Sequence, residues 1–395
     1  QWQTGIGYEG VHPNALGIIG VLGIVFWGCM GFLRLVLTLG MVPIGVLGIW
    51  FLLKPFNSAW MKTTGAAIYF VAPVAYQSLS TGSWDGLILF GCLPWMLLFL
   101  ARASRSSPFG PIGGPTSRFA YEADIFREVL TLGFILGLVF SFSPLVLFAV
   151  TLIVVCLCVG SLVAGWKLGF SRLFLILILS YAMAAALNFP WILDYFFSDF
   201  SWNTIFHTRS TVAETVDLLG ALRLQTELGQ NSVFGWGFPA LAFVPLMLAR
   251  GERWAWAVRG CSLYLAGVAA IWVNGMGYLP FVLPRAEVLL VPAALGVAVA
   301  SAMGVGSLQR DLQTYKFGWR QLIPVTAIIA SCLVILPVLG SAFSGDWGIP
   351  DDELNDVLFS EEETNQNIRV LWIGDDDLLA ASGRQFLDNF TISIT

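Results

Sequence analysis

Long apolar stretches separated by short polar connections fill this chain up to residue 343, and acidic, polar sequence follows. The runs Leu145–Ala164, Ser171–Pro190 and Leu322–Leu339 are typical of the apolar part. About 20 apolar residues in a helix cross the roughly 30 Å hydrocarbon core of a bilayer. The pattern therefore predicts an all-α polytopic membrane protein.

Apolar windows, divided at proline, glycine and charge, predict about 10–11 transmembrane helices. The segments are 15–33, 35–53, 63–79, 86–101, 129–143, 145–164, 172–190, 233–249, 257–274, 286–305 and 321–343. The continuous stretch 129–164 would make a helix of about 54 Å, which is too long for one crossing. We expect Ser143-Pro144 to break it into two spans.

Composition agrees with a membrane protein, because 57% of the 395 residues are hydrophobic and only 11% are charged. A soluble domain averages about 25% charged residues. All six cysteines lie within apolar runs, so we expect neither disulfides nor a zinc site. The acidic balance excludes nucleic acid as a partner.

The charges of alternate connections predict which ends of the spans share a side. Connections around 54–62, 102–128, 167–172, 250–259 and 310–320 carry 14 of the 20 basic residues and 5 of the 25 acids. Because cytoplasmic loops are enriched in Lys and Arg, we place these connections in the cytoplasm of a plasma-membrane protein. The segment 344–395 then lies outside the cytoplasm, with twelve acids from Asp346 onward against two arginines.

Three regions follow from this topology. Residues 1–34 form an outer loop with a glycine-rich segment that is either re-entrant or a first crossing. Residues 35–343 form a multi-helix membrane domain whose long outer loop, 191–232, contains an amphipathic helix. Residues 344–395 begin a β-containing extracytoplasmic domain, with strands expected at 368–374 and 390–395. Because the chain starts with Gln and ends within a strand pattern, we expect an interior piece of a longer protein.

The turn at 80–86 is the first candidate site, with one aromatic ring and one carboxylate at the outer boundary. Trp84 would stack on a sugar while Asp85 takes a proton from an acceptor hydroxyl. The alternative is structural, with Trp84 anchored at the interface and Asp85 as the N-cap of the next span.

A second candidate lies in residues 5–14, where Glu9 and His12 are three apart. A carboxylate–imidazole pair would act as base and orienter, or would help to hold a divalent cation. A chance pairing in a polar loop is the alternative.

The long outer loop supplies further candidates around the predicted amphipathic helix Thr211–Leu228, which would lie on the membrane surface or cap a cavity. Its expected substrate-binding residues are Trp191, Asp194, Arg209 and Arg223. The two arginines would clamp a lipid phosphate. Ion pairs with Glu214 or Glu227 are the alternative.

Arg285 and Glu287 begin the span 286–305, again at the outer edge. We include both among the candidate substrate-binding residues, with Arg285 on a phosphate; interface anchoring is the alternative. The triplet Asp375–Asp377 has no second cluster of ligands, so a solvated turn is favoured there over a metal site.

A family resemblance adds to this interpretation. It rests on 45–50 with Lys54-Pro55, AYQSLSTGSWDGL at 75–87, LPW at 93–95, LARAS at 100–104, PFG at 108–110, EVLLVP at 287–292, FGWRQ at 317–321 and RVLWIGD at 369–375. In this order these stretches resemble large actinobacterial membrane glycosyltransferases, which place a cytoplasmic family 2 domain before a GT-C-like membrane region. The resemblance implies transfer from a polyprenyl-phosphate-linked sugar at the outer face.

Two departures bear on that resemblance. The family 2 catalytic domain is absent from these residues, and the acidic residue expected in the first outer loop has no unambiguous match. Glu9 occupies that place only if residues 1–14 are external. We therefore expect the membrane module of an envelope glycosyltransferase, with Glu9 and Asp85 as catalytic candidates. The alternatives are a non-catalytic translocator of lipid-linked glycan and a structural subunit that binds other membrane subunits.

Overall fold

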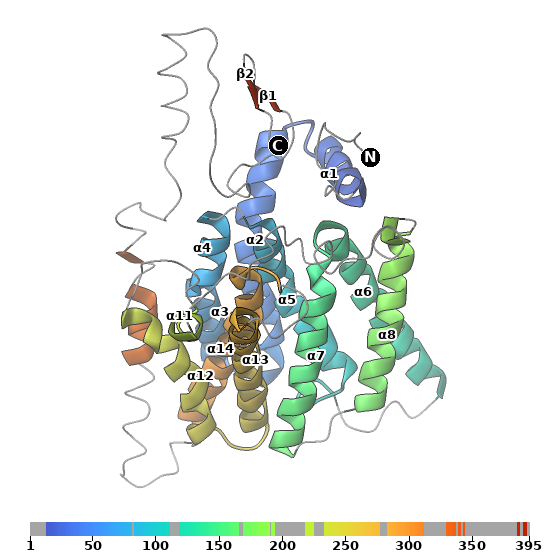
Figure 1. Cartoon of the computed structure of the whole chain (residues 1–395). Coiled ribbons are helices and arrows are strands. Elements are labelled where there is room, and N and C mark those ends of the chain that lie inside the picture. The colour runs from blue at the N-terminus through green and yellow to red at the C-terminus, as the bar shows by residue number, and fades with distance from the viewer. Residues whose placement is uncertain are drawn as a thin grey trace.

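A computed structural model describes residues 13–80, 83–110, 118–165, 169–189, 191–193, 218–224, 233–276, 283–311, 329–336, 339–340, 343, 385–387 and 390–392 (Figure 1). The longer helices are α2 (Met30–Leu52), α5 (Trp84–Ala103), α6 (Arg118–Phe142), α7 (Leu145–Ala164), α8 (Phe170–Leu187), α13 (Glu252–Gly275) and α14 (Ala286–Asp311). The shorter ones are α1 (Pro13–Val25), α3 (Ala59–Val71), α4 (Pro73–Ser80), α11 (Leu218–Leu222) and α12 (Gly237–Leu248). Among the described residues there are also three single turns of 3₁₀ helix, η1 (Lys54–Phe56), η2 (Trp191–Leu193) and η3 (Val233–Trp236).

Within the described residues, seven helices are long and apolar enough to cross a membrane. They are Met30–Phe56, Trp84–Ala103, Asp124–Phe142, Leu145–Ala164, Phe170–Leu187, Glu252–Gly275 and Ala286–Gln309. The chain is therefore a helical, multi-pass membrane protein. The last predicted span, 321–343, lies mostly outside the described residues, but 329–336 is helical, with Ala330 and Val334 buried.

Prolines divide two of the predicted apolar stretches. Helix α6 ends at Phe142 and α7 begins at Leu145, which confirms the break predicted at Pro144. The span predicted as one segment over 63–79 is wrong, because α3 ends before Ala72 and a new helix starts at Pro73. Ala72 is extended, with ψ of 125°, since a residue that precedes proline is pushed out of the α region.

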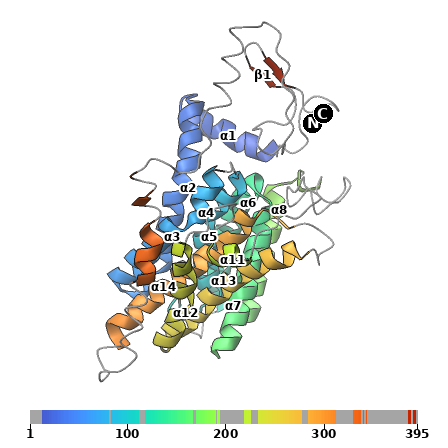
Figure 2. The same ribbon diagram turned by 60° about the vertical axis from the view of Figure 1, so that its left-hand side comes forward.

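The N-terminal boundary also differs from the prediction of spans at 15–33 and 35–53. The chain turns between Val25 and Met30, where Trp27 and Gly28 adopt left-handed backbone conformations. Helix α2 therefore starts at Met30 and contains Arg34 within its second turn. The 13 residues of α1 make a helix of about 20 Å, shorter than a crossing. Figures 1 and 2 show α1 and the first turns of α2 beyond the end of the other helices.

The centre of the bundle is the antiparallel pair of α13 and α14, which pack along a seam of small residues. A Cβ at Gly260 would lie only 2.7 Å from the carbonyl oxygen of Gly296, and one at Gly267 only 2.8 Å from that of Leu289. Ala293 and Ala300 continue the seam on α14. Because lipid tails are as apolar as side chains, close backbone approach of this kind drives helix association in membranes.

The other helices pack around this pair. Helix α14 is almost wholly buried and contacts α3, α4, α5 and α12, while α7 packs against α13. Helix α2 packs against α5, and α8 packs against α6 (Figure 1). The bundle therefore has a central helix that few lipids could reach, surrounded by helices with apolar outer faces.

Four connections and the end of α14 meet at one end of the bundle, which we call the basic end. Ser58 donates to Gln309 Oε1 over 2.9 Å, the Gly169 N–H donates to the Ser104 carbonyl over 3.3 Å, and Ser107 donates to Glu252. All these residues lie in or beside connections that the charge pattern placed on one side. The grouping is confirmed among the described residues, and its assignment to the cytoplasm stays a prediction.

A short hairpin is described near the end of the chain. Strand β1 (Gln385–Leu387) pairs antiparallel with β2 (Phe390–Ile392), with Gln385 opposite Ile392. The second strand lies within the predicted strand 390–395. The strand predicted at 368–374 and the triplet Asp375–Asp377 lie outside the described residues.

The seam between α13 and α14 predicts that Gly296→Val unfolds the bundle, because the new side chain would overlap the backbone of Gly260. Gly275→Val is the control, since nothing lies within 4 Å of a Cβ there. In thermal unfolding in detergent, the midpoint temperature should fall strongly for Gly296→Val and hardly at all for Gly275→Val. Equal midpoints for both variants would contradict the packing described here.

Candidate functional site

The first turn of α5 carries two of the predicted residues, Trp84 and Asp85. Both are half-buried, and Trp84 packs against the core. The turn is set by glycine, since a Cβ at Gly86 would overlap the side chain of Ser78 on α4. Ser78 is itself buried and donates to the Val74 carbonyl over 2.8 Å. The close contact between α4 and α5 thus fixes where Asp85 emerges.

The structural alternative for Asp85 needs one correction. Ser83, not Asp85, occupies the N-cap position of α5, with an extended backbone at ψ of 92°. Asp85 lies inside the first helical turn, where a carboxylate interacts favourably with the positive end of the helix dipole.

The start of α14 carries Arg285 and Glu287. The Arg285 carbonyl accepts from the Val288 and Leu289 N–H groups at 3.0 and 3.3 Å, so this residue closes the first turn. Glu287 is 2% exposed, which is rare for a carboxylate. The chain leading into this turn is held by Asn274, whose Oδ1 accepts from the Leu283 N–H at 2.8 Å.

The structure brings these two helix starts to the same end of the bundle, opposite the basic end. Helix α14 packs against both α4 and α5, and each of α5 and α14 runs from this opposite end to the basic end. Asp85, Arg285 and Glu287 thus begin two parallel, neighbouring helices. The positive N-terminal end of each of these helices favours an anion.

The long loop departs from the prediction of one helix over Thr211–Leu228. Helix α11 ends at Leu222, and Leu224 has a φ of 59°, which no continuing helix permits. The Leu222 carbonyl accepts from Tyr264 Oη at 2.6 Å. Tyr264 is twelve residues along α13, about 18 Å from its start, so α11 packs at mid-height rather than at the end of the bundle.

Arg223 follows α11 and lies with its guanidinium 4.8 Å from the ring centre of Trp236. Its Nε is buried without a hydrogen-bond partner. A cation at this depth in a membrane is costly and marks a candidate for function. The predicted pairing with Glu214 or Glu227 involves residues outside the described ones.

Other predicted residues fall outside the described part of the chain. Glu9, His12, Asp194 and Arg209 lie outside the described residues, and Trp191 is placed only by its backbone in η2. In the part of the chain that the structure describes, no three His, Cys, Asp or Glu side chains gather as a set of metal ligands. A divalent cation at Glu9 and His12 stays a prediction.

An ion-pair cluster at the basic end was missed by the sequence reasoning. Asp124 on α6 accepts from Arg105 at 2.6 Å and from Arg172 at 2.9 Å, and Arg172 also donates to Glu128 at 2.9 Å. Asp124 and Glu128 are four apart, a spacing that places them on one helix face and could have indicated a shared partner. The cluster ties α6 and α8 to the connection that follows α5.

Comparison of the chain with protein-family models, with curated proteins and with solved structures finds no match. Function must therefore be argued from the side chains themselves, because a helical bundle is compatible with many activities.

The ion-pair cluster predicts that Asp124→Asn destabilises the protein, because Arg172 is only 6% exposed and would lose a charged partner. A hydrogen bond to a charged group contributes about 2 kcal/mol, and Arg172 keeps Glu128 as its second partner. Arg127→Gln is the control, since this arginine contacts the same carboxylate while 77% exposed. Exposed pairs contribute about 0.5 kcal/mol.

Thermal unfolding in one detergent would compare the two variants. We expect a clearly lower unfolding midpoint for Asp124→Asn and a near-wild-type midpoint for Arg127→Gln. A wild-type midpoint for Asp124→Asn would show that the cluster adds no stability.

Proposed function

We propose that this chain is the membrane module of a cell-envelope glycosyltransferase that uses a polyprenyl-phosphate-linked sugar at the end of the bundle opposite the basic end. One observation carries the proposal: Asp85, Arg285 and Glu287 begin two neighbouring helices there, and Glu287 is almost fully buried. The family resemblance of the sequence supports the same assignment.

The donor phosphate would lie at the start of α14. The N-terminal end of this long helix carries a partial positive charge, and Arg285 adds a full one. Arginine suits a phosphate because its planar guanidinium donates two parallel hydrogen bonds. The polyprenyl chain would lie against the apolar outer faces of the bundle, so that only the phosphate and sugar enter the site.

Asp85 would act on the acceptor. Its carboxylate takes the proton of the acceptor hydroxyl while that oxygen attacks the anomeric carbon of the sugar. The bond from the anomeric carbon to the phosphate oxygen breaks, and the polyprenyl phosphate leaves with the electron pair. Positive charge at the helix start stabilises the phosphate as it departs. Glu287 would hold a sugar hydroxyl, and Trp84 would shield one side of the site.

Asp85→Asn removes the base without changing the size of the side chain, and we expect transfer to fall at least about 10²-fold. Arg285→Gln should slow transfer as well, by weakening the hold on the phosphate. The assay follows label from a panel of polyprenyl-phosphate-linked pentoses and hexoses into envelope acceptors, with the full chain in membranes. Arg127→Gln, exposed at the opposite end, should transfer at the wild-type rate.

Normal transfer by both Asp85→Asn and Arg285→Gln would refute the assignment of the site. Binding of donor lipid without any cleavage by the wild-type protein would refute an enzyme and favour a translocator.

A further inference from the structure

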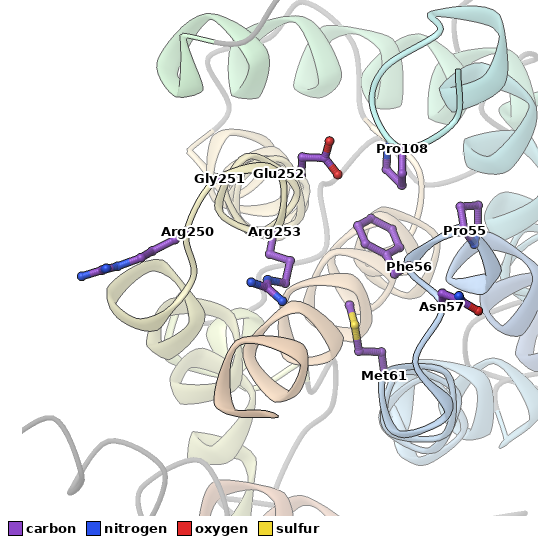
Figure 3. Close-up of a pocket in the computed structure, with 9 residues that line it drawn as sticks. All are labelled: Pro55, Phe56, Asn57, Met61, Pro108, Arg250, Gly251, Glu252 and Arg253. Atoms are coloured by element: carbon purple, nitrogen blue, oxygen red, sulfur yellow. The ribbon is translucent and has the colours of Figure 1, made fainter. Parts of the chain in front are cut away.

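A second feature lies at the basic end, far from the proposed transferase site. A cavity of about 560 Å³ opens there between three connections. It is lined by Pro55, Phe56, Asn57, Met61, Pro108, Arg250, Gly251, Glu252 and Arg253 (Figure 3). One side is thus aromatic and aliphatic, and the other is charged.

The charged side chains differ in direction. Figure 3 shows Glu252 extending on the Pro108 side and Arg253 on the Met61 side, whereas Arg250 extends away from both. Glu252 accepts a hydrogen bond from the Ser107 hydroxyl, which holds its carboxylate at the Pro108 side. Arg253 Nη1 donates to the Gly306 carbonyl over 3.3 Å and so is braced against α14.

The cavity lies at the depth where hydrocarbon gives way to headgroups. The candidate span Met30–Phe56 ends at one of its walls, and the candidate span Glu252–Gly275 begins at another. Trp60, in the adjoining first turn of α3, is 67% exposed, as expected of an aromatic residue at the membrane boundary.

Two lysines adjoin the lining residues Pro55 and Met61 in the sequence. Lys54 and Lys62 lie over the rings of Phe51 and Trp50, with Nζ 6.0 and 5.0 Å from the ring centres. Basic residues near an anionic membrane surface are attracted to it. The first backbone hydrogen bond of α13 runs from the Ala255 N–H to the Gly251 carbonyl, so the amides before it point out of the helix end.

We propose that this cavity binds the phosphodiester headgroup of an anionic membrane phospholipid. Arg253 and the first amides of α13 contact the phosphate, and Phe56, Met61 and Pro108 pack against the glycerol and the first carbons of the chains. The bound lipid bridges the connection after α2 and the start of α13, and so stabilises the basic end. The site is independent of the proposed transferase function.

The test compares wild-type protein with Arg253→Gln, and uses Arg127→Gln as a matched loss of one arginine at the same end. Native mass spectrometry of protein purified in mild detergent should show retained phosphatidylglycerol on the wild type and on Arg127→Gln. Arg253→Gln should retain at least about tenfold less. Size-exclusion chromatography checks that each variant is folded.

A second measurement does not depend on any variant. In nanodiscs, replacing phosphatidylcholine by phosphatidylglycerol should raise the unfolding temperature of the wild-type protein, and about 0.5 M salt should reduce the gain. Equal lipid retention by Arg253→Gln and Arg127→Gln would overturn the proposal. So would an unfolding temperature that does not rise when phosphatidylglycerol replaces phosphatidylcholine. Displacement of the lipid by glycerol 1-phosphate at equal concentration would also overturn it, because a soluble phosphate would then be the ligand.

Discussion

Close backbone contact between α13 and α14 is the constraint on which the rest of the bundle depends. Gly260 and Gly296 permit it, since any side chain at either position would meet the backbone of the other helix. The contact buries α14 and fixes its direction relative to α13. Because α3, α4, α5 and α12 all pack on α14, the register of this pair also sets where the ends of those helices lie.

The two ends of the bundle differ in their chemistry as a result. At the basic end, connections are linked by hydrogen bonds and by the cluster around Asp124, and positive charge predominates. At the opposite end, Asp85 and Glu287 lie in the first turns of two parallel helices, and Arg285 precedes the second of them. The proposed sugar transfer and the proposed lipid site therefore use separate surfaces at opposite ends of one bundle.

The sequence predicted the membrane class, most span positions and the grouping of connections, because length, apolarity and charge are local properties. Pro144 was recognised as a break because it divides a stretch too long for one crossing. Pro73 was not, because the segment around it has the length of a single span. The predicted helix over Thr211–Leu228 had the right periodicity, but Leu224 turns left-handed where the chain packs beside Tyr264, and such a tertiary contact leaves no periodic signal.

The candidate site was predictable in part. Asp85, Arg285 and Glu287 were identified from their place at span edges, yet that they begin neighbouring helices depends on the packing of α14 against α4 and α5. Burial of Glu287 could not be inferred, since acidic residues at helix starts are usually exposed. The cluster of Arg105, Asp124 and Arg172 joins three segments distant in sequence, and only the fold unites them.

Sidedness is the claim that everything functional here depends on, and cysteine labelling in intact cells tests it most directly. The exposed native thiols Cys29 and Cys332 are first changed to serine. Ala59→Cys then marks the basic end and Met276→Cys the opposite end, both at exposed positions. A membrane-impermeant maleimide should label Met276→Cys in intact cells, and Ala59→Cys only after lysis. Labelling of Ala59→Cys but not Met276→Cys in intact cells would contradict the account.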